Sequence, residues 1–163
     1  MKRSIFTYLA LAISALAAGA LVYGYLRPQL LSGSSWNNSP ALQTILLISG
    51  FLPDFLHTYA FILLTFITLG VTSKYSLHIS MAFWLLVESL FEIGQHPFFS
   101  HFFARLEAFA SGSFFPIPFV TGYFLHGTFD PLDLSAIFLA ALAAFFTTRY
   151  FQNQEHSYEQ IHF

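Results

Sequence analysis

LHISMAFWLLVESLFEIGQ, residues 77–95, is an apolar run of membrane-spanning length that carries two carboxylates. Glu88, Glu92 and Gln95 follow at i, i+4 and i+7, so they share one stripe of a predicted helix. An ionisable group at the centre of a spanning helix costs about 3 kcal/mol on insertion scales, so it marks a functional candidate. The stretch predicts a transmembrane helix whose polar stripe must face other polar groups of the chain.

The composition is that of an integral membrane protein. Of the 163 residues, 56% are hydrophobic and 9% are charged, whereas about 25% are charged in soluble domains. The length allows about four spanning helices with short connections. The chain contains no cysteine, which excludes disulfides, iron–sulfur clusters and thiolate metal sites. No basic patch points to nucleic acid, and the partners that the composition indicates are membrane lipids.

Four apolar segments have spanning length, at about residues 5–26, 54–71, 77–95 and 132–151. The first is either a retained helix or a cleaved signal peptide, and its length of about 22 residues favours retention. Pro53 is expected to open the second span, since proline is tolerated at a helix start, with residues 41–50 as a separate interfacial helix. The expected fold class is all-α, a single polytopic membrane domain with four transmembrane helices.

Residues 96–131, between the third and fourth spans, are aromatic, contain several Gly and Pro residues, and are too broken to span. We expect an interfacial or re-entrant segment there, with a short amphipathic helix at residues 102–109. Basic residues favour both termini and the polar tail, residues 152–163, on the cytoplasmic side. In that topology four basic residues are inside, Lys2, Arg3, Lys74 and Arg149, and two are outside, Arg27 and Arg105.

In this topology the outer ends of three spans carry polar clusters, whereas the inner ends have no comparable acids. The clusters are Asp54 with His57, Glu92 with Gln95, and Asp130 with Asp133. Glu88 lies about 10 Å deeper than Gln95 at 1.5 Å per residue. We expect these clusters to form one polar pocket that opens outward. Its candidate binding residues are Asp54, His57, Glu88, Glu92, Gln95, Asp130 and Asp133.

Most of these residues also have a purely structural interpretation. Three aspartates lie in predicted first turns, where a carboxylate caps backbone N–H groups: Asp54, Asp130 and Asp133. His57 would hydrogen-bond a carboxylate within the bundle, and Glu88 would be protonated against a neighbouring helix. Glu92 is neither a cap nor near an inside basic residue. The candidates for acid–base chemistry are Glu92, His57 and Asp133, and the sequence leaves open whether the protein is an enzyme.

The sequence identifies no cofactor. A bis-histidine haem is not expected, because His57 and His78 fall at opposite predicted faces. The outer histidines have spacings that match no standard metal motif: His96, His101 and His126. A divalent cation is a hypothesis, since magnesium and calcium prefer oxygen ligands of the kind offered by Asp54, Glu92, Asp130 and Asp133.

Three segments occur in an order that resembles a known family: LPDFLHTYAFILL (52–64), ESLFEIGQ (88–95) and GTFDPLDL (127–134). Together they resemble the VanZ-like family, small bacterial membrane proteins linked to teicoplanin resistance and the cell envelope, over about residues 52–145. The resemblance implies an outward-facing site in the bacterial plasma membrane. It also implies a ligand that is a lipid-linked or peptidoglycan-related precursor or a glycopeptide antibiotic. The signature positions would be Asp54, His57, Glu92, Gln95, Asp130 and Asp133.

The chain departs from the family pattern in several places. The family commonly has an arginine just before its Phe-Asp, where this chain has His126, Gly127 and Thr128. Ile137 and Ala140 stand where an Asn and a Gly are common, and the interval between Gln95 and Asp130 is longer. Arg105, inside that interval, is the candidate replacement for the family arginine.

A second hypothesis assigns the chain to a larger membrane complex as a non-catalytic accessory subunit. The acids would then be caps and helix contacts, and the Phe-rich outer segment would dock a protein partner through Phe114, Phe115 or Phe119. Glu92→Gln and Asp133→Asn separate the hypotheses, because only a functional pocket depends on these carboxylates.

Overall fold

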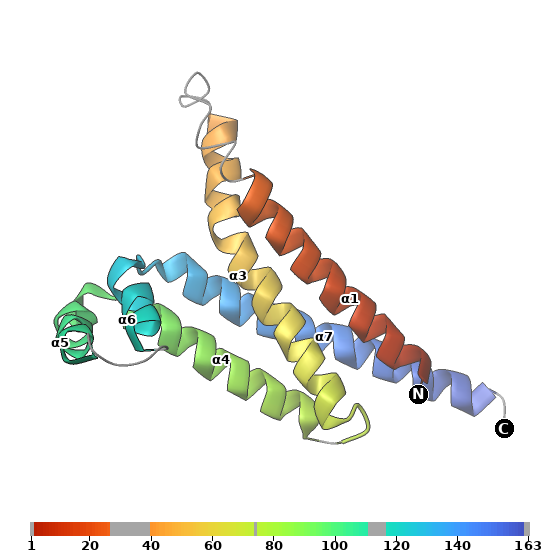
Figure 1. The fold of residues 1–163 in the computed structure, drawn as a ribbon. Coiled ribbons are helices and arrows are strands. Elements are labelled where there is room, and N and C mark those ends of the chain that lie inside the picture. The colour runs from red at the N-terminus through yellow and green to blue at the C-terminus, as the bar shows by residue number, and fades with distance from the viewer. Residues whose placement is uncertain (1, 27–39, 74, 111–116, 162–163) are drawn as a thin grey trace.

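The computed structural model describes residues 2–26, 40–73, 75–110 and 117–161, in which every regular element is a helix (Figure 1). The elements are α1 (Lys2–Leu21), the π-helical turn η1 (Val22–Leu26), α3 (Pro40–Leu69), α4 (Ser76–Gly94), the short 3₁₀ helix η2 (Pro97–Phe99), α5 (Ser100–Ala110), α6 (Ile117–His126) and α7 (Pro131–Ile161). Four helical segments of the described chain are long and apolar enough to cross a membrane: Ile5–Tyr25, Leu47–Leu69, Ser76–Gly94 and Pro131–Gln154. The predicted all-α polytopic fold is confirmed.

Helix α3 is the centre of the bundle. It packs against α1, α7 and α4, while α4 also packs against α7 and α1 makes only slight contact with α7. Small side chains are buried where these helices meet, and they let the backbones approach closely. They come from α1, α3 and α7: Ala12, Ala15, Ala60, Ala141 and Ala144.

Hydrogen bonds and aromatic contacts join α3 and its neighbours. The Tyr8 hydroxyl donates to the Thr148 carbonyl at 3.3 Å, and its ring contacts Phe66 edge-on at 5.5 Å. The Trp84 indole N–H donates to Thr65 Oγ1 at 2.8 Å, which ties α4 to α3. Polar groups inside an apolar bundle are thereby satisfied between helices rather than by water. Because Tyr8 is buried in the core, α1 is an integral part of this bundle.

The outer surface of α4 is an apolar stripe. Ile79, Phe83, Leu86 and Leu90 are exposed at helical spacing, as expected of a helix face in contact with lipid acyl chains. The buried residues of α4 are Ser76, Leu77, Ser80 and Glu92. Glu92 therefore points into the bundle, whereas His78 of the same helix is exposed.

The predicted start of the second span is wrong. Pro53 lies inside α3, which begins at Pro40 and includes the segment expected to be a separate interfacial helix. A proline within a helix removes one backbone hydrogen bond and bends the axis, and α3 changes direction between its orange and yellow parts (Figure 1). Membrane helices tolerate such a proline because packing against neighbours satisfies the freed groups.

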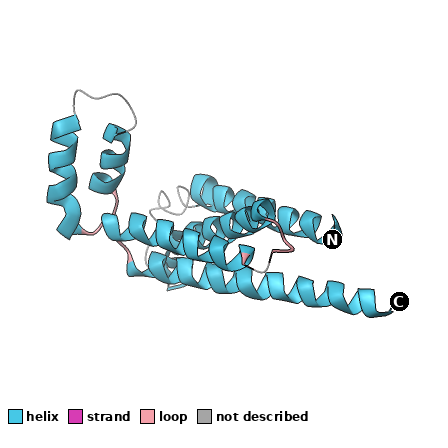
Figure 2. Cartoon of the chain, turned by 90° about the horizontal axis from the view of Figure 1, so that it is seen from below, coloured by secondary structure: helices cyan, strands magenta, loops and turns pink. Residues whose placement is uncertain are grey.

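Helices α5 and α6 form a hairpin that stands across the ends of α4 and α7 (Figure 2). The Phe124 ring stacks on Phe103 at 4.3 Å and on Phe91 at 5.4 Å, which attaches the hairpin to α4. A Cβ on Gly94 would lie 2.6 Å from the Phe124 ring, so this close contact depends on glycine. The expected short helix is present and longer than predicted, the second helix was not predicted, and Phe114 and Phe115 lie outside the described residues.

Both described ends of the chain lie at the end of the bundle opposite the hairpin (Figures 1 and 2). The connection between α3 and α4 lies at the same end as the two termini. The expected tail is helical, because α7 continues through residue 161 rather than ending near 151. The two ends of the bundle therefore differ, and the polar residues of the predicted site lie toward the hairpin end.

Candidate functional site

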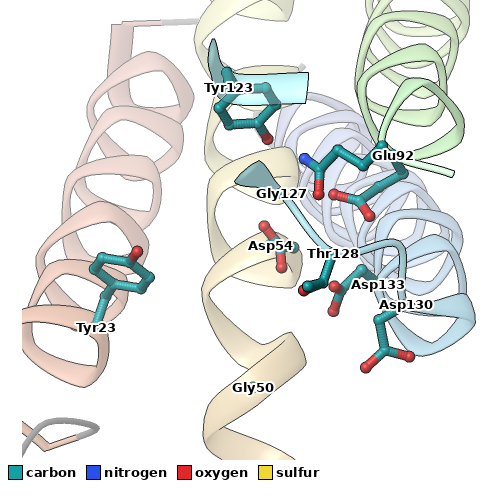
Figure 3. Close-up of a pocket in the computed structure, with 10 residues that line it drawn as sticks. Tyr23, Gly50, Asp54, Glu92, Tyr123, Gly127, Thr128, Asp130 and Asp133 are labelled. Carbon is teal, nitrogen blue, oxygen red and sulfur yellow. The ribbon is translucent and has the colours of Figure 1, made fainter. Parts of the chain in front are cut away.

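A pocket of about 460 Å³ lies at the hairpin end of the bundle (Figure 3). It is lined by residues of η1, α3, α4, α6, α7 and the connection before α7: Tyr23, Gly50, Asp54, Glu92, Gln95, Tyr123, Gly127, Thr128, Asp130 and Asp133. The structure thus brings together five of the predicted site residues, Asp54, Glu92, Gln95, Asp130 and Asp133. Each of the three polar clusters of the sequence contributes at least one residue to the cavity.

Asp54 enters the pocket from the interior of α3, directly after Pro53. The capping interpretation of this residue is wrong, because the first turn of the helix lies more than three turns earlier, at Pro40. One turn further along, Thr58 is fully buried, and its Oγ1 has no hydrogen-bond partner among the described residues. Asp54 therefore lies on the side of a continuous helix, where its carboxylate cannot cap the free N–H groups of a helix start.

Glu92 is the most enclosed carboxylate of the pocket. Its side chain is 8% exposed, and its buried Oε2 has no hydrogen-bond partner in the described part of the chain. Figure 3 shows the Glu92 carboxylate pointing toward the space between Asp54 and Asp133. A buried polar oxygen without a partner costs about 1–3 kcal/mol, so its retention calls for an explanation.

Asp130 and Asp133 begin α7 in the way the sequence predicts. The Leu132 N–H donates to Asp130 Oδ1 at 2.9 Å, and the Asp133 N–H donates to the Asp130 carbonyl at 3.0 Å. Asp130 is thus the N-cap, with Pro131 in the first helical position, where its missing N–H is no loss. Asp133 lies in the first turn. Both carboxylates also line the pocket, so capping does not exclude a second role.

Gln95 is held between two residues of the hairpin side. It makes a side-chain hydrogen bond with Tyr123, and a Cβ on Gly127 would overlap the Gln95 side chain, with Cγ at 2.8 Å. Gly127 therefore leaves the space that the glutamine occupies. The glycine is needed for this close approach and not for a special backbone angle, since the positive φ in the described chain belongs to Gly70.

The Tyr123 hydroxyl lies in a negative electrostatic environment. Burial raises the pKa of this phenol above its usual value, and the charges of Glu92, Asp54 and Glu88 raise it further. The hydrogen bond with Gln95 lowers the pKa and only partly offsets these effects. The phenol stays protonated near neutral pH, so Tyr123 offers an O–H donor and an aromatic ring to the pocket.

Three candidates from the sequence are not among the pocket-lining residues. His57 packs against α1, with Nε2 3.6 Å from the place of a Cβ on Gly19, and stacks on Phe61 at 6.0 Å. Glu88 is half-buried on α4 without lining the pocket. Arg105 is exposed on α5. Asp54 and His57 are three residues apart on α3, and the contact of His57 with Gly19 shows that its side chain lies against α1.

Sequence reasoning missed half of the pocket lining: Tyr23, Gly50, Tyr123, Gly127 and Thr128. Tyr23 lies in η1, at the end of the first span, and Tyr123 lies on the helix that was not predicted. A sequence signal for the two tyrosines was present. Tyrosine rings gather at membrane interfaces, and both residues lie at predicted outer ends of apolar segments. No pattern in the sequence points to Gly127, whose role depends on the position of Gln95.

The charges that line the pocket have one sign. Four carboxylates line it, from Asp54, Glu92, Asp130 and Asp133, and the lining residues include no lysine, arginine or histidine. Within the described ranges, no group of three or more His, Asp or Glu side chains is arranged to hold a metal ion. The pocket is therefore an anionic cavity whose acids are spread around its wall rather than gathered at one point.

The fold and the pocket define the class of this protein as an all-α, polytopic membrane protein with an acidic cavity at one end of its helix bundle. No family model matches the chain, and no curated protein or solved structure matches it either.

Proposed function

We propose that this chain is a VanZ-like protein of the bacterial cell envelope whose acidic pocket opens to the outer face of the plasma membrane. The pocket binds a polar group of a lipid-linked or peptidoglycan-related precursor or of a glycopeptide antibiotic. Both termini are then cytoplasmic. In this proposal the protein binds its ligand through the pocket. If it also catalyses a reaction, Glu92 and Asp133 are the acid–base groups.

Glu92 is the single observation that carries this proposal. The Glu92 residue is 8% exposed, and its buried Oε2 lacks a hydrogen-bond partner among the described residues. An intramembrane carboxylate is costly and rarely kept without a role. The order of the three polar segments, which resembles the VanZ-like pattern, adds support, because Asp54, Gln95 and Asp133 meet Glu92 in one cavity.

Glu92→Gln and Asp133→Asn test the proposal in a glycopeptide-susceptible bacterium that expresses the protein. Each change keeps the side-chain shape and removes one negative charge. We expect each variant to lose most of any decrease in teicoplanin susceptibility that the wild type confers, while the amount of inserted protein stays within twofold. Growth inhibition by teicoplanin and immunoblotting of membranes provide the two measurements.

Glu155→Gln is the matched control, because it removes the same charge near the opposite end of α7. Its susceptibility should equal that of the wild type. Wild-type susceptibility in both Glu92→Gln and Asp133→Asn would overturn the role of the pocket.

The exposed aromatic face of the hairpin favours the accessory-subunit function as the second candidate. Phe98 of η2, just before the hairpin, is 79% exposed, and Phe102 of α5 is 61% exposed. Aromatic residues are enriched in protein interfaces. Phe98→Ser and Phe102→Ser would then abolish function while Glu92→Gln preserves it. The same susceptibility assay therefore distinguishes the two functions.

A further inference from the structure

The chemistry of the pocket wall specifies the charge of a ligand. Asp54, Glu92, Asp130 and Asp133 contribute four carboxylates, and no basic side chain is among the lining residues. A cavity lined by charges of one sign concentrates ions of the opposite sign. The raised pKa of Tyr123, outside the spans, has the charges of Glu92 and Asp54 among its causes. The ligand that this wall attracts is a cation.

The size and spread of the site distinguish an organic cation from a metal ion. Calcium takes six to eight oxygen ligands at about 2.3–2.6 Å, whereas the described residues contain no group of three acids or histidines so arranged. The cavity volume is about 460 Å³, within the range of about 300–1,000 Å³ typical of small-molecule sites. A polyatomic cation with several N–H donors can reach carboxylates that one metal ion cannot bridge.

Glu92 supplies the observation that points to a donor. Its carboxylate is directed into the cavity (Figure 3), and its buried Oε2 accepts no hydrogen bond from the described residues. An ammonium group carries up to three N–H donors and makes charge-assisted hydrogen bonds to carboxylates. An ammonium at this place would satisfy Oε2 and also neutralise the charge that burial disfavours.

Two aromatic rings complete the environment. Tyr23 of η1 and Tyr123 of α6 line the cavity from two sides of the carboxylates (Figure 3). The face of a tyrosine ring attracts ammonium groups through its quadrupole. Carboxylates together with aromatic rings are a combination that favours an organic cation over a hydrated metal ion, which would retain its water shell.

We infer that the pocket binds a ligand bearing an organic ammonium group, with Glu92 as its principal partner and Asp54 and Asp133 as the flanking carboxylates. This inference rests on the proposed function and names the chemical class that its pocket accepts. Two sources offer the same chemistry, an aminated lipid headgroup in the outer leaflet and a soluble polyamine.

The test measures thermal unfolding of the full chain in a neutral maltoside detergent. The probes are spermidine, a short-chain phosphatidylethanolamine, a short-chain phosphatidylglycerol that lacks the ammonium, and magnesium chloride. A ligand that binds only the folded state raises the unfolding midpoint, and the rise grows with the logarithm of its concentration relative to its Kd. We expect spermidine or the phosphatidylethanolamine to raise the midpoint saturably, and phosphatidylglycerol and magnesium to have no such effect.

Variants assign the effect to the pocket. Glu92→Gln should require at least tenfold more of the active probe for the same rise, and Glu155→Gln should match the wild type. Asp133→Asn serves the same comparison if Glu92→Gln does not give a monodisperse protein. A response to spermidine alone assigns a soluble polyamine, and a response to phosphatidylethanolamine alone assigns a lipid headgroup.

Three outcomes overturn the inference. They are a midpoint that no ammonium probe raises, an equal response in wild type and Glu92→Gln, and a Glu92-dependent response to magnesium in place of the ammonium probes. If one of these outcomes occurs but Glu92→Gln abolishes the teicoplanin phenotype of the wild type, the proposed function stands and only the ammonium class of the ligand is wrong. Wild-type susceptibility in that variant contradicts the proposed function itself.

Discussion

At the residue scale, Glu92 and Thr58 are described side chains with a buried oxygen that lacks a hydrogen-bond partner. They differ in the consequence of that deficit. Glu92 lines the pocket, where a ligand can supply a donor. Thr58 is fully buried and is not among the lining residues. We therefore expect removal of the Glu92 carboxylate to impair function, whereas removal of the Thr58 hydroxyl should leave function unchanged.

Thr58→Val tests this difference. The substitution replaces the hydroxyl by a methyl group of similar size and removes an unsatisfied buried oxygen, which costs about 1–3 kcal/mol when it has no partner. We expect the free energy of unfolding to rise by about 1 kcal/mol, with teicoplanin susceptibility unchanged. Denaturant unfolding in detergent measures the change. A loss of stability would mean that the hydroxyl makes a hydrogen bond that the substitution breaks.

Gly127→Ala tests the close approach of the α6–α7 connection to α4. The added methyl would overlap the Gln95 side chain, with Cγ at 2.8 Å, and overpacking of this kind costs about 1–3 kcal/mol. We expect Gly127→Ala to lower the unfolding free energy by that amount. The double variant with Gln95→Ala should recover most of the loss, because it removes the atoms in conflict. Additive losses in the double variant would contradict a direct contact.

At the element scale, the bent helix α3 decides where the acids of the pocket lie. Pro53 predicts a helix start in the sequence, because a proline in a first turn sacrifices no hydrogen bond. In the structure the helix continues through it, since packing in a membrane bundle compensates for one lost bond. Asp54 is consequently on the side of a continuous helix, facing α4 and α7, instead of at a free helix end.

A hydrogen bond between α1 and α7 can be tested by substitution of Tyr8. The Tyr8 hydroxyl donates to the Thr148 carbonyl at 3.3 Å, and Tyr8 is 1% exposed. Hydrogen bonds between membrane helices contribute about 0.6 kcal/mol on average. We expect Tyr8→Phe to reduce the unfolding free energy by about this amount, because the ring contacts with Phe66 and Phe151 remain.

Tyr8→Ala is the comparison, since it removes the ring as well, and loss of a buried aromatic ring costs about 3–5 kcal/mol. Unfolding in detergent measures both variants. Equal losses in Tyr8→Phe and Tyr8→Ala would contradict a contribution from ring packing.

At the scale of the whole molecule, the two ends of the bundle have different chemistry. The pocket and the hairpin lie at one end, and both described termini lie at the other (Figure 1). The basic residues Lys2, Arg3 and Arg149 belong to the sequence near the termini. By the positive-inside rule these residues favour a cytoplasmic position for that end, in agreement with the outward-facing pocket that we propose.

The absence of cysteine from the sequence makes this orientation directly testable. Single cysteines at Thr128, which is exposed at the pocket, and at Ser73, which is exposed at the opposite end, are treated with a membrane-impermeant maleimide in intact cells. We expect Thr128→Cys to be labelled and Ser73→Cys to react only after the membrane is permeabilised. The reverse pattern would turn the pocket toward the cytoplasm and overturn the envelope function.

The sequence by itself determined the number and approximate places of the spans, because bilayer thickness and the need to satisfy every backbone group leave few alternatives to helices of about 20 residues. It also predicted that polar groups gather at one end, since depth follows from position along each helix. Only the tertiary structure decided that His57 faces α1 and that Tyr23, Tyr123 and Gly127 join the carboxylates. The rotation of each helix about its axis is set by contacts between residues far apart in the chain, and a bend at Pro53 alters that rotation. For this reason the depth of a polar residue could be predicted from the sequence, whereas the direction in which it points could not.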